Sequence, residues 1–308
     1  VTLAAGPHLK NTIAINKANN VFISQHIGDL ENIESINAFK RVINDIKSFY
    51  ELTPEHVICD LHPDYISTKY AESLDLPVYK VQHHYAHVLS CMAENELDGS
   101  DLLGVSWDGT GYGTDGTIWG GEFIVPQGTS FKRAGYFKPF RLPGGEQAIK
   151  EPWRMAISYL HHMYGNDIHL LRLFNTSKFI KEKNDTLEIL CKMLSRKINS
   201  PLTSSMGRLF DGVASLLDLQ HSVNYEGQAA IKLESIADEH ETGYYSFVMN
   251  TNGVKSYNVP LIIQWQPVIK KIIEDMHHKT AIPIISAKFH NSIVEMIVQI
   301  CTMLRNRK

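Results

Sequence analysis

The chain has 308 residues, of which 44% are hydrophobic and 20% are charged, a composition that is typical of a folded globular protein and argues against disorder. Its formal net charge of −3 provides no global basic field, so we expect no nucleic acid as a partner. The four cysteines form no C-x-x-C pair and the N-terminus lacks the pattern of a secretory signal, so we expect a cytoplasmic protein without a disulfide framework.

The first quarter of the chain predicts strands that alternate with helices. Residues 1–30 contain three short β-favouring runs separated by Gly, Pro and Asn breaks, which is the pattern of an opening β-meander. Hydrophobic residues recur at helical spacing over 32–50 and 66–74, while 56–62 and 76–82 are typical of short buried strands. This alternation predicts a largely parallel sheet with helical crossovers.

The rest of the chain changes character twice. Residues 101–125 predict a strand, a Gly-rich turn and a second strand, after which long helical stretches, including a Leu-rich run at 169–174, indicate a helical insertion. The chain then returns to an αβ pattern and ends in an apolar helix over 287–304, whose most apolar run is too short to cross a bilayer, so we expect no membrane partner. We therefore expect three parts: a first subdomain, a helical insertion and the start of a second subdomain, over residues 1–138, 139–240 and 241–308.

Three histidines lie within five residues in the segment VQHHYAH, residues 81–87. In a helix, His83 and His87 project from the same face one turn apart, whereas His84 turns to another side. Two imidazoles on one face can hold a divalent cation of the zinc or iron type when a carboxylate or water completes the shell. An isolated H-x-x-x-H pair is nevertheless more often a set of solvated or partly buried polar residues at a helix start.

Asp108 follows about twenty residues later, at the predicted end of a strand and directly before a glycine-rich run. A carboxylate at this edge of an open αβ sheet lies where such sheets place ligands, although alone it could simply stabilise a hairpin turn. Together with His83 and His87 it supplies two imidazoles and one oxygen. This set leaves open positions for a substrate and favours a catalytic metal over a structural one.

Seven segments, in this order and spacing, resemble the carbamoyltransferase HypF family of nickel-iron hydrogenase maturation: LKNT, SQHIGDLEN, CDLHPDYIST, VQHHYAH, DGTGYGTDGTIWGGEF, GRLFDGVASLL and YEGQAA. The resemblance covers essentially the whole chain and concerns the C-terminal catalytic domain of that family. It implies an α/β fold of the actin-like, duplicated ribonuclease-H-like kind, with a helical insertion and an incomplete second half.

The resemblance also implies an activity. A YrdC-like domain, which precedes this domain in full-length members, makes carbamoyl adenylate from carbamoyl phosphate and ATP. The domain seen here would move the carbamoyl group to the C-terminal cysteine of the partner HypE, toward the cyanide ligands of the hydrogenase iron. A divalent transition metal, iron or zinc, would act as a Lewis acid on the carbamoyl oxygen.

The resemblance assigns roles residue by residue. His83, His87 and Asp108 would be the metal ligands, and Asp108 would act in catalysis with Lys10 and Asn11. These two residues could approach phosphate or carbamoyl oxygens, or could merely form a polar hairpin. The nucleotide would be bound by Gly109, Thr110, Gly111, Gly207, Asp211, Glu226 and Gly227.

Two of these nucleotide assignments have simpler alternatives. Asp211 could bind the ribose hydroxyls, with Gly207 allowing close approach, or could be a solvated helical residue. Glu226 could face the nucleotide or could be a carboxylate at a helix N-terminus. No spacing assigns a task to a further set of polar residues in the matching segments, namely His26, Asp29, His62, Asp64 and His84.

The closing motifs of the family, including a loop that supplies a last metal-binding carboxylate, would lie beyond residue 308. We therefore expect the 308 residues alone to be inactive in carbamoyl transfer. Three alternatives share this architecture: an O-carbamoyltransferase, an enzyme like the tRNA threonylcarbamoyl-transferases, and a non-catalytic docking fragment.

Overall fold

The structure is a computed structural model that describes residues 1–98, 101–165, 183–250 and 259–306. Its internal contacts divide the chain into two compact units, of which the first comprises Val1–Ala86 with Gly111–Gly116 and the second His87–Thr110 with Thr117–Lys308. Each unit is described by itself. The division into three parts expected from the sequence stays a prediction.

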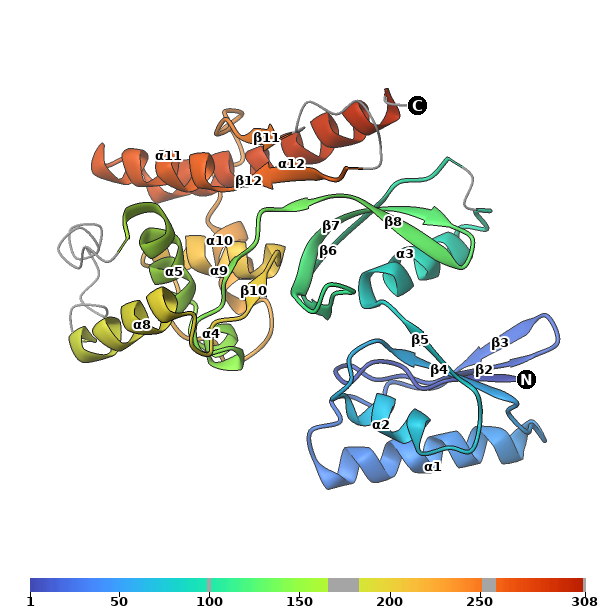
Figure 1. Ribbon diagram of the computed structural model, residues 1–308. Coiled ribbons are helices and arrows are strands. Elements are labelled where there is room, and N and C mark those ends of the chain that lie inside the picture. The colour runs from blue at the N-terminus through green and yellow to red at the C-terminus, as the bar shows by residue number, and fades with distance from the viewer. Residues whose placement is uncertain (99–100, 166–182, 251–258, 307–308) are drawn as a thin grey trace. The chain divides into compact units, whose positions relative to one another are not determined.

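The first unit contains a five-stranded sheet in the order β3-β2-β1-β4-β5. The three N-terminal strands pair antiparallel, which confirms the opening meander, and β4 and β5 continue the sheet parallel to β1. The elements of this unit are β1 (Thr2–Ala4), β2 (Ala14–Lys17), β3 (Asn20–Ile23), α1 (Ile33–Phe49), β4 (His56–Asp60), α2 (Ile66–Glu72) and β5 (Val78–Val81). Helices α1 and α2 lie against the sheet in Figure 1.

Helix α1 shows why this layer forms where the sequence predicts it. Asn32 caps the helix, because its side chain accepts a hydrogen bond of 2.8 Å from the backbone N–H of Ser35. The apolar residues Phe39, Val42 and Ile43 recur at helical spacing and are buried in the core of the unit.

The second unit is built on a seven-stranded sheet in the order β11-β12-β8-β7-β10-β9, with β6 paired to β7. The strands are β6 (Gly104–Tyr112), β7 (Ile118–Gln127), β8 (Ser130–Phe137), β9 (Phe140–Arg141), β10 (Leu202–Thr203), β11 (Val248–Asn250) and β12 (Leu261–Gln264). The helices are α3 (His83–Glu94), α4 (Glu146–Lys150), α5 (Trp153–Tyr164), α8 (Asn184–Arg196), α9 (Met206–Leu216), α10 (Gln228–Ser235), α11 (Gln266–His277) and α12 (Ile282–Arg305). Helix α3 and strand β6 contribute residues to both units. The α/β class expected from the sequence is therefore confirmed.

Strand β6 corrects one expectation, because it does not end at Asp108. The strand runs on to Tyr112, so Gly109 and Gly111 are strand residues rather than members of a turn. Neither glycine has a positive φ. Glycine is required at position 111 because a side chain there would collide with α3: a Cβ atom on Gly111 would lie 2.5 Å from Cε1 of His84.

The helical insertion is confirmed over the described residues, where α4, α5, α8, α9 and α10 follow the sheet strands (Figure 1). The Leu-rich run at 169–174 lies outside the described residues. Helix α5 packs on α9, and the fully buried ring of Tyr159 covers Gly212. The hydroxyl of Tyr159 donates a hydrogen bond of 2.8 Å to the backbone oxygen of Arg208, which fixes the position of α9.

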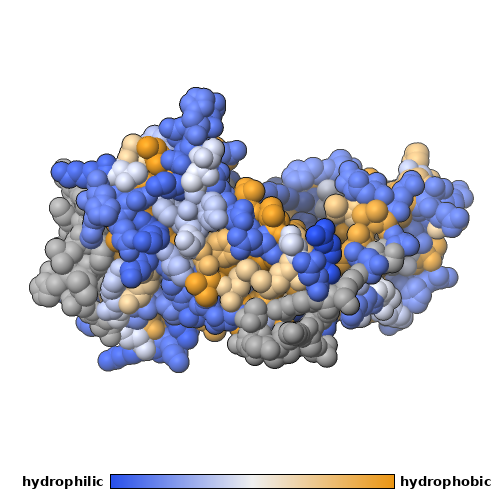
Figure 2. Space-filling model, turned by 90° about the horizontal axis from the view of Figure 1, so that it is seen from above, coloured by the Kyte–Doolittle hydropathy of each residue, from blue (hydrophilic) through white to orange (hydrophobic). Residues whose placement is uncertain are grey.

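Helices α11 and α12 form one outer layer of the second unit, which Figure 2 shows face-on. Hydrophobic side chains, drawn orange, interrupt the hydrophilic surface of this face. Two residues of α12, Val294 and Val298, are 59% and 53% exposed. Over the part of the chain that the structure describes, no helix combines the length and the hydropathy needed to span a membrane.

Gly212 provides a test of the α5–α9 packing. In most helix interiors Gly→Ala stabilises by about 1 kcal/mol. Here the added Cβ would lie 2.1 Å from Cε2 of a buried aromatic ring. We therefore expect Gly212→Ala to lower the free energy of unfolding by about 1–3 kcal/mol, as overpacking does. Urea unfolding measures the change.

A second variant checks the cause of this loss. Replacing the ring as well, in Gly212→Ala with Tyr159→Leu, should cost less than the sum of the two single changes, because the ring that collides is gone. Unchanged or increased stability of Gly212→Ala would contradict the packing described.

Candidate functional site

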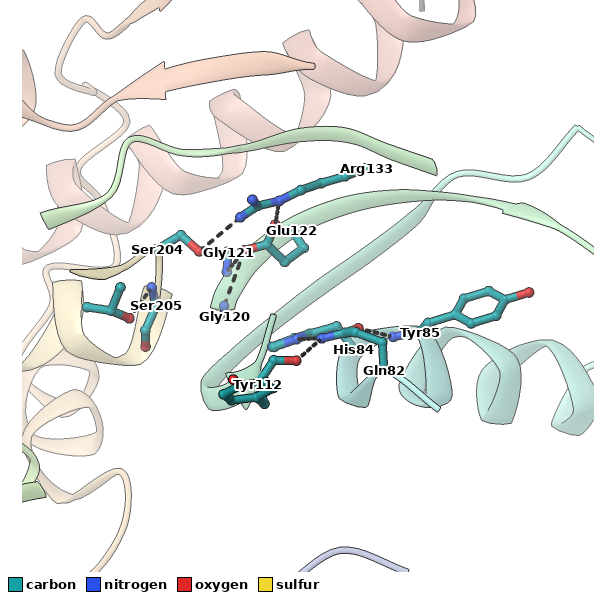
Figure 3. A network of polar contacts seen from close by, with 11 residues as sticks. Gln82, His84, Tyr85, Tyr112, Gly120, Gly121, Glu122, Arg133, Ser204 and Ser205 are labelled. Carbon is teal, nitrogen blue, oxygen red and sulfur yellow. Dashed lines mark hydrogen bonds and ion pairs between the residues drawn. The ribbon is translucent and has the colours of Figure 1, made fainter. Parts of the chain in front are cut away.

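Helix α3 begins at His83 because the preceding side chain caps it. The Oε1 atom of Gln82 accepts a hydrogen bond of 2.9 Å from the backbone N–H of Tyr85 (Figure 3). The amide nitrogen of Gln82 lies 3.1 Å from the backbone oxygen of Tyr112 and 3.0 Å from Nδ1 of His84. An amide nitrogen can only donate, so Nδ1 of His84 is the acceptor in this contact. His84 is 0% exposed, and Gln82, which bonds both to His84 and to Tyr112, joins the helix start to the end of β6.

His83 and His87 follow this cap on one helix, at the spacing predicted from the sequence. His83 is partly buried, and its Nδ1 atom lies 2.8 Å from Oδ2 of Asp60. The side chain of His87 is 59% exposed, and its Nε2 atom lies 3.7 Å from Oδ2 of Asp108. The other oxygen of Asp108 accepts a hydrogen bond of 2.6 Å from the backbone N–H of Gly109, which fixes the carboxylate on its strand.

Helix α3 and strand β6 carry three side chains of the types that bind metals in proteins. His83, His87 and Asp108 each offer one ligand atom, and these atoms lie within 4.8 Å of one another. Two imidazole nitrogens and one carboxylate oxygen are donors that suit zinc or iron. The structure thus brings the three predicted ligands together, and the donor set fits the metal that the sequence implies. Their role as ligands stays a prediction.

The start of helix α9 is tied directly to the strand that carries Asp108. Ser205 caps the helix by accepting a hydrogen bond of 3.1 Å from the backbone N–H of Arg208. The Ser205 hydroxyl also lies 3.0 Å from the backbone oxygen of Asp108 and 2.8 Å from that of Gly109. One hydroxyl therefore joins α9 to β6 at the position of the candidate metal ligand.

A buried carboxylate supports the same junction from the sheet. Oε1 of Glu122 accepts hydrogen bonds from the backbone N–H groups of Gly120 and Gly121, both at 3.3 Å, and from the hydroxyl of Ser204 at 2.6 Å (Figure 3). Its Oε2 atom accepts a hydrogen bond of 2.6 Å from Nε of Arg133. A carboxylate with 0% exposure is tolerated because both of its oxygens are satisfied.

Asp211, the predicted ribose contact, lies one turn further along α9 and is 4% exposed. The alternative that it is a solvated helical residue is therefore wrong. Its Oδ2 atom lies 3.1 Å from Nη2 of Arg208 but has no hydrogen-bond partner among the described residues. Burial raises the pKa of Asp211 to about 6, and the nearby guanidinium of Arg208 only partly offsets this effect.

Glycines set the distance between α9 and β6. A Cβ atom on Gly207 would lie 3.0 Å from Cα of Gly109, a distance at which backbone would have to move. Gly207 therefore allows α9 to pack closely against β6. Thr110 follows Gly109 on that strand. Whether these residues also contact a nucleotide stays a prediction.

Three further predicted site residues lie in loops or turns of the chain. Glu226 is exposed in the turn before α10, and Gly227 is the N-cap residue of that helix with a φ of 76°, a conformation that favours glycine. Lys10 is exposed, and its backbone N–H donates a hydrogen bond of 2.7 Å to Oδ1 of Asp29. Nucleotide binding by Glu226 and Gly227, and a catalytic role for Lys10, stay predictions.

Asn11 is completely buried in the first unit. Its side-chain amide donates hydrogen bonds to the backbone oxygens of Ala5, at 2.9 Å, and of Pro7, at 2.6 Å. These bonds hold the loop between β1 and β2, which is a structural task. A catalytic role for Asn11 stays a prediction.

Sequence reasoning missed several residues of this site. Asp60 had a detectable signal, since it is a carboxylate at the carboxyl end of a parallel strand, where ligands and their supporting groups gather. The capping residues Gln82 and Ser205 and the buried Arg208 had no comparable signal, because their tasks depend on distant backbone atoms.

Comparison with known proteins gives one consistent family. Residues 1–94 match the family described as the HypF Kae1-like domain, and residues 104–308 match the family described as the second subdomain of the carbamoyltransferase Kae1-like domain. The chain is 43% identical over 309 residues to the carbamoyltransferase HypF of Synechocystis, a match that covers 97% of this chain and 39% of that protein. It is 40% identical to the HypF of Rhizobium leguminosarum, over 76% of this chain and 30% of that protein.

Solved structures agree with these matches. A crystal structure of full-length HypF in a phosphate- and nucleotide-bound form is similar with a TM-score of 0.91 and 39% identity, over 100% of this chain and 39% of that one. The HypF of T. kodakarensis is similar with a TM-score of 0.83 and 27% identity, over 97% of this chain and 39% of that one. The chain thus spans about two fifths of the length of these relatives.

The buried carboxyl of Asp211 predicts a pH dependence of stability. The pKa of this group rises from 3.8 to about 6 on folding, so between these pH values the folded protein retains a proton that the unfolded chain releases. The wild type should therefore lose stability, relative to Asp211→Asn, as the pH rises from about 4 to about 6.

Urea unfolding of both proteins across this pH range provides the measurement. The free energy of unfolding of Asp211→Asn minus that of the wild type should increase through the range and then level off. A difference that stays constant or falls would show that the carboxyl titrates normally.

Proposed function

The chain belongs to the HypF carbamoyltransferase family, and on that premise we propose that its Kae1-like domain transfers a carbamoyl group from carbamoyl adenylate to the C-terminal cysteine of HypE. In this reaction the thiolate sulfur forms a bond to the carbamoyl carbon, and the bond from that carbon to the phosphate oxygen of AMP breaks. The observation that carries the proposal is the group formed by His83, His87 and Asp108.

These three side chains would hold the metal. Zinc or iron bound there would supply a Lewis acid that polarises the carbamoyl oxygen. The Asp108 side chain is held in place in two ways. Its strand is joined to α9 through Ser205, and its carboxylate accepts a hydrogen bond from the Gly109 N–H. Small errors of placement at a reacting centre cost on the order of 100-fold in rate, so this support matters for catalysis.

The first turns of α9 would bind the nucleotide. Gly207 and Gly109 bring two backbones close together without side chains, and the Asp211 carboxylate lies one turn further along the helix. An acidic side chain there can accept hydrogen bonds from ribose hydroxyls. The similarity to a full-length HypF structure in a nucleotide-bound form supports a nucleotide as a ligand of the family.

The partners of the reaction follow from the same family membership. Carbamoyl adenylate would come from a YrdC-like domain, and HypE would supply the acceptor thiol. The chain contains four cysteines, all of them free thiols, which supports the cytoplasmic setting expected from the sequence.

Metal content tests the observation on which the proposal depends. We expect the wild type to retain one zinc or ferrous ion per chain after loading and desalting, and His83→Ala with His87→Ala to lose it. The matched control changes two adjacent exposed histidines, His277 and His278, to alanine and should leave the metal content unchanged. Equal metal in the wild type and in the His83 and His87 double variant would rule out the proposed site.

Activity is best tested in a full-length context, because the chain spans 39% of the Synechocystis relative. We would replace the matching region of that relative with this chain and supply carbamoyl phosphate, ATP and a HypE tail peptide. Mass spectrometry should detect a carbamoylated peptide, and the His83 and His87 double variant of the chimera should give none. A folded, metal-loaded chimera that leaves the peptide unmodified would contradict the proposed function.

A further inference from the structure

Asp60 is the last residue of β4, and both oxygens of its carboxylate are engaged. The residue is 8% exposed. Its Oδ1 atom accepts a hydrogen bond of 2.9 Å from the backbone N–H of His62, and its Oδ2 atom lies 2.8 Å from Nδ1 of His83. The backbone oxygen of Asp60 accepts a hydrogen bond of 3.2 Å from the hydroxyl of Thr68. The carboxylate is thus held by the His62 N–H and by His83, and the Thr68 hydroxyl of α2 holds the backbone of the same residue.

This geometry selects one tautomer of His83. An ionised carboxylate can only accept hydrogen bonds, so Nδ1 of His83 must carry the proton in the 2.8 Å contact. The proton-free nitrogen of a neutral imidazole is then Nε2, and this is the atom that can bind a metal.

The other side of the His83 ring is also constrained. A Cβ atom on Gly111 would lie 3.0 Å from Cδ2 of His83, so the β6 backbone packs against the ring edge next to Nε2. The ring is therefore held between a carboxylate at Nδ1 and a glycine backbone at its opposite edge. Both contacts lie within the first unit.

We propose that Asp60 is a positioning residue for His83, which fixes the tautomer and orientation of the imidazole so that Nε2 is presented to a divalent metal ion. A carboxylate that accepts from the remote N–H of a metal-binding histidine also makes that histidine a stronger ligand. This inference rests on the metal site of the proposed function. The inference gives a task to a residue of the CDLHPDY segment, whose polar residues received no task from their spacing in the sequence.

A simpler task for Asp60 would be to stabilise the turn after β4 through the N–H of His62. Asp60→Asn separates the two tasks. If the Asn oxygen keeps the bond to His62, its NH₂ group faces Nδ1 of His83 and favours the wrong tautomer. If the amide turns over, its NH₂ group faces the His62 N–H instead, and two donors oppose each other.

Zinc affinity, measured by competition with a chromophoric chelator, tests the proposal. We expect Asp60→Asn to bind zinc about 10- to 100-fold more weakly than the wild type. The matched control is Asp64→Asn, which makes the same charge change four residues later. Asp64 is exposed and pairs with Lys69 at 3.3 Å, so the control should keep wild-type affinity.

The effect must also act through His83. In a His83→Ala background, Asp60→Asn should cause no further loss of zinc affinity, whereas a general loss of structure would add to the first change. Equal zinc affinity of the wild type and Asp60→Asn would overturn the inference and leave the metal site standing. A wild type that binds no zinc would overturn the proposed site and this inference with it.

A measurement on the wild type remains decisive even if Asp60→Asn fails to fold. Nitrogen-15 chemical shifts of the imidazoles in the metal-free protein report which ring nitrogen carries the proton. We expect His83 to be the Nδ1–H tautomer, and an Nε2–H tautomer would overturn the inference.

Discussion

Strand β6 approaches its neighbours closely because glycine stands at the two points of contact, Gly111 on the strand itself and Gly207 on α9. Gly109 lies beside the start of α9, where a Cβ atom on Gly207 would be only 3.0 Å from Cα of Gly109. Gly111 packs against the rings of His83 and His84. Asp108 directly precedes Gly109 on the same strand. The placement of the candidate metal ligand thus depends on the absence of side chains beside it.

Buried polar groups around the site are satisfied to different degrees. Glu122 accepts four hydrogen bonds and holds a structural junction, as expected for a buried charge that a fold tolerates. Asp211 has one ion-pair contact, with Arg208, and an elevated pKa. A buried carboxyl that the fold leaves incompletely satisfied is the kind of local cost that proteins accept at binding sites. By this contrast Glu122 is a supporting residue of the site, and Asp211 is a residue that we propose binds a ligand.

Much of the fold was predictable from local patterns. The opening meander, α1 and the spacing of His83 and His87 follow from periodicity and capping signals, and the family resemblance is confirmed by the matches over residues 1–94 and 104–308. Two features were not predictable, because they depend on contacts between distant segments. The glycines of β6 have the local pattern of a turn, and only the rings of His83 and His84 show why position 111 carries no side chain. The contact between Asp60 and His83 likewise joins residues that are 23 positions apart.

The central claim is that His83, His87 and Asp108 bind one divalent metal ion. Zinc-edge X-ray absorption of the zinc-loaded chain tests it most directly, because it reports the identity of the ligand atoms. The account predicts two imidazole nitrogens at about 2.0–2.1 Å from the zinc and oxygen donors in the rest of the shell. It also predicts that one imidazole disappears in His87→Ala. A shell without imidazole scattering, or one that His87→Ala leaves unchanged, would contradict the claim.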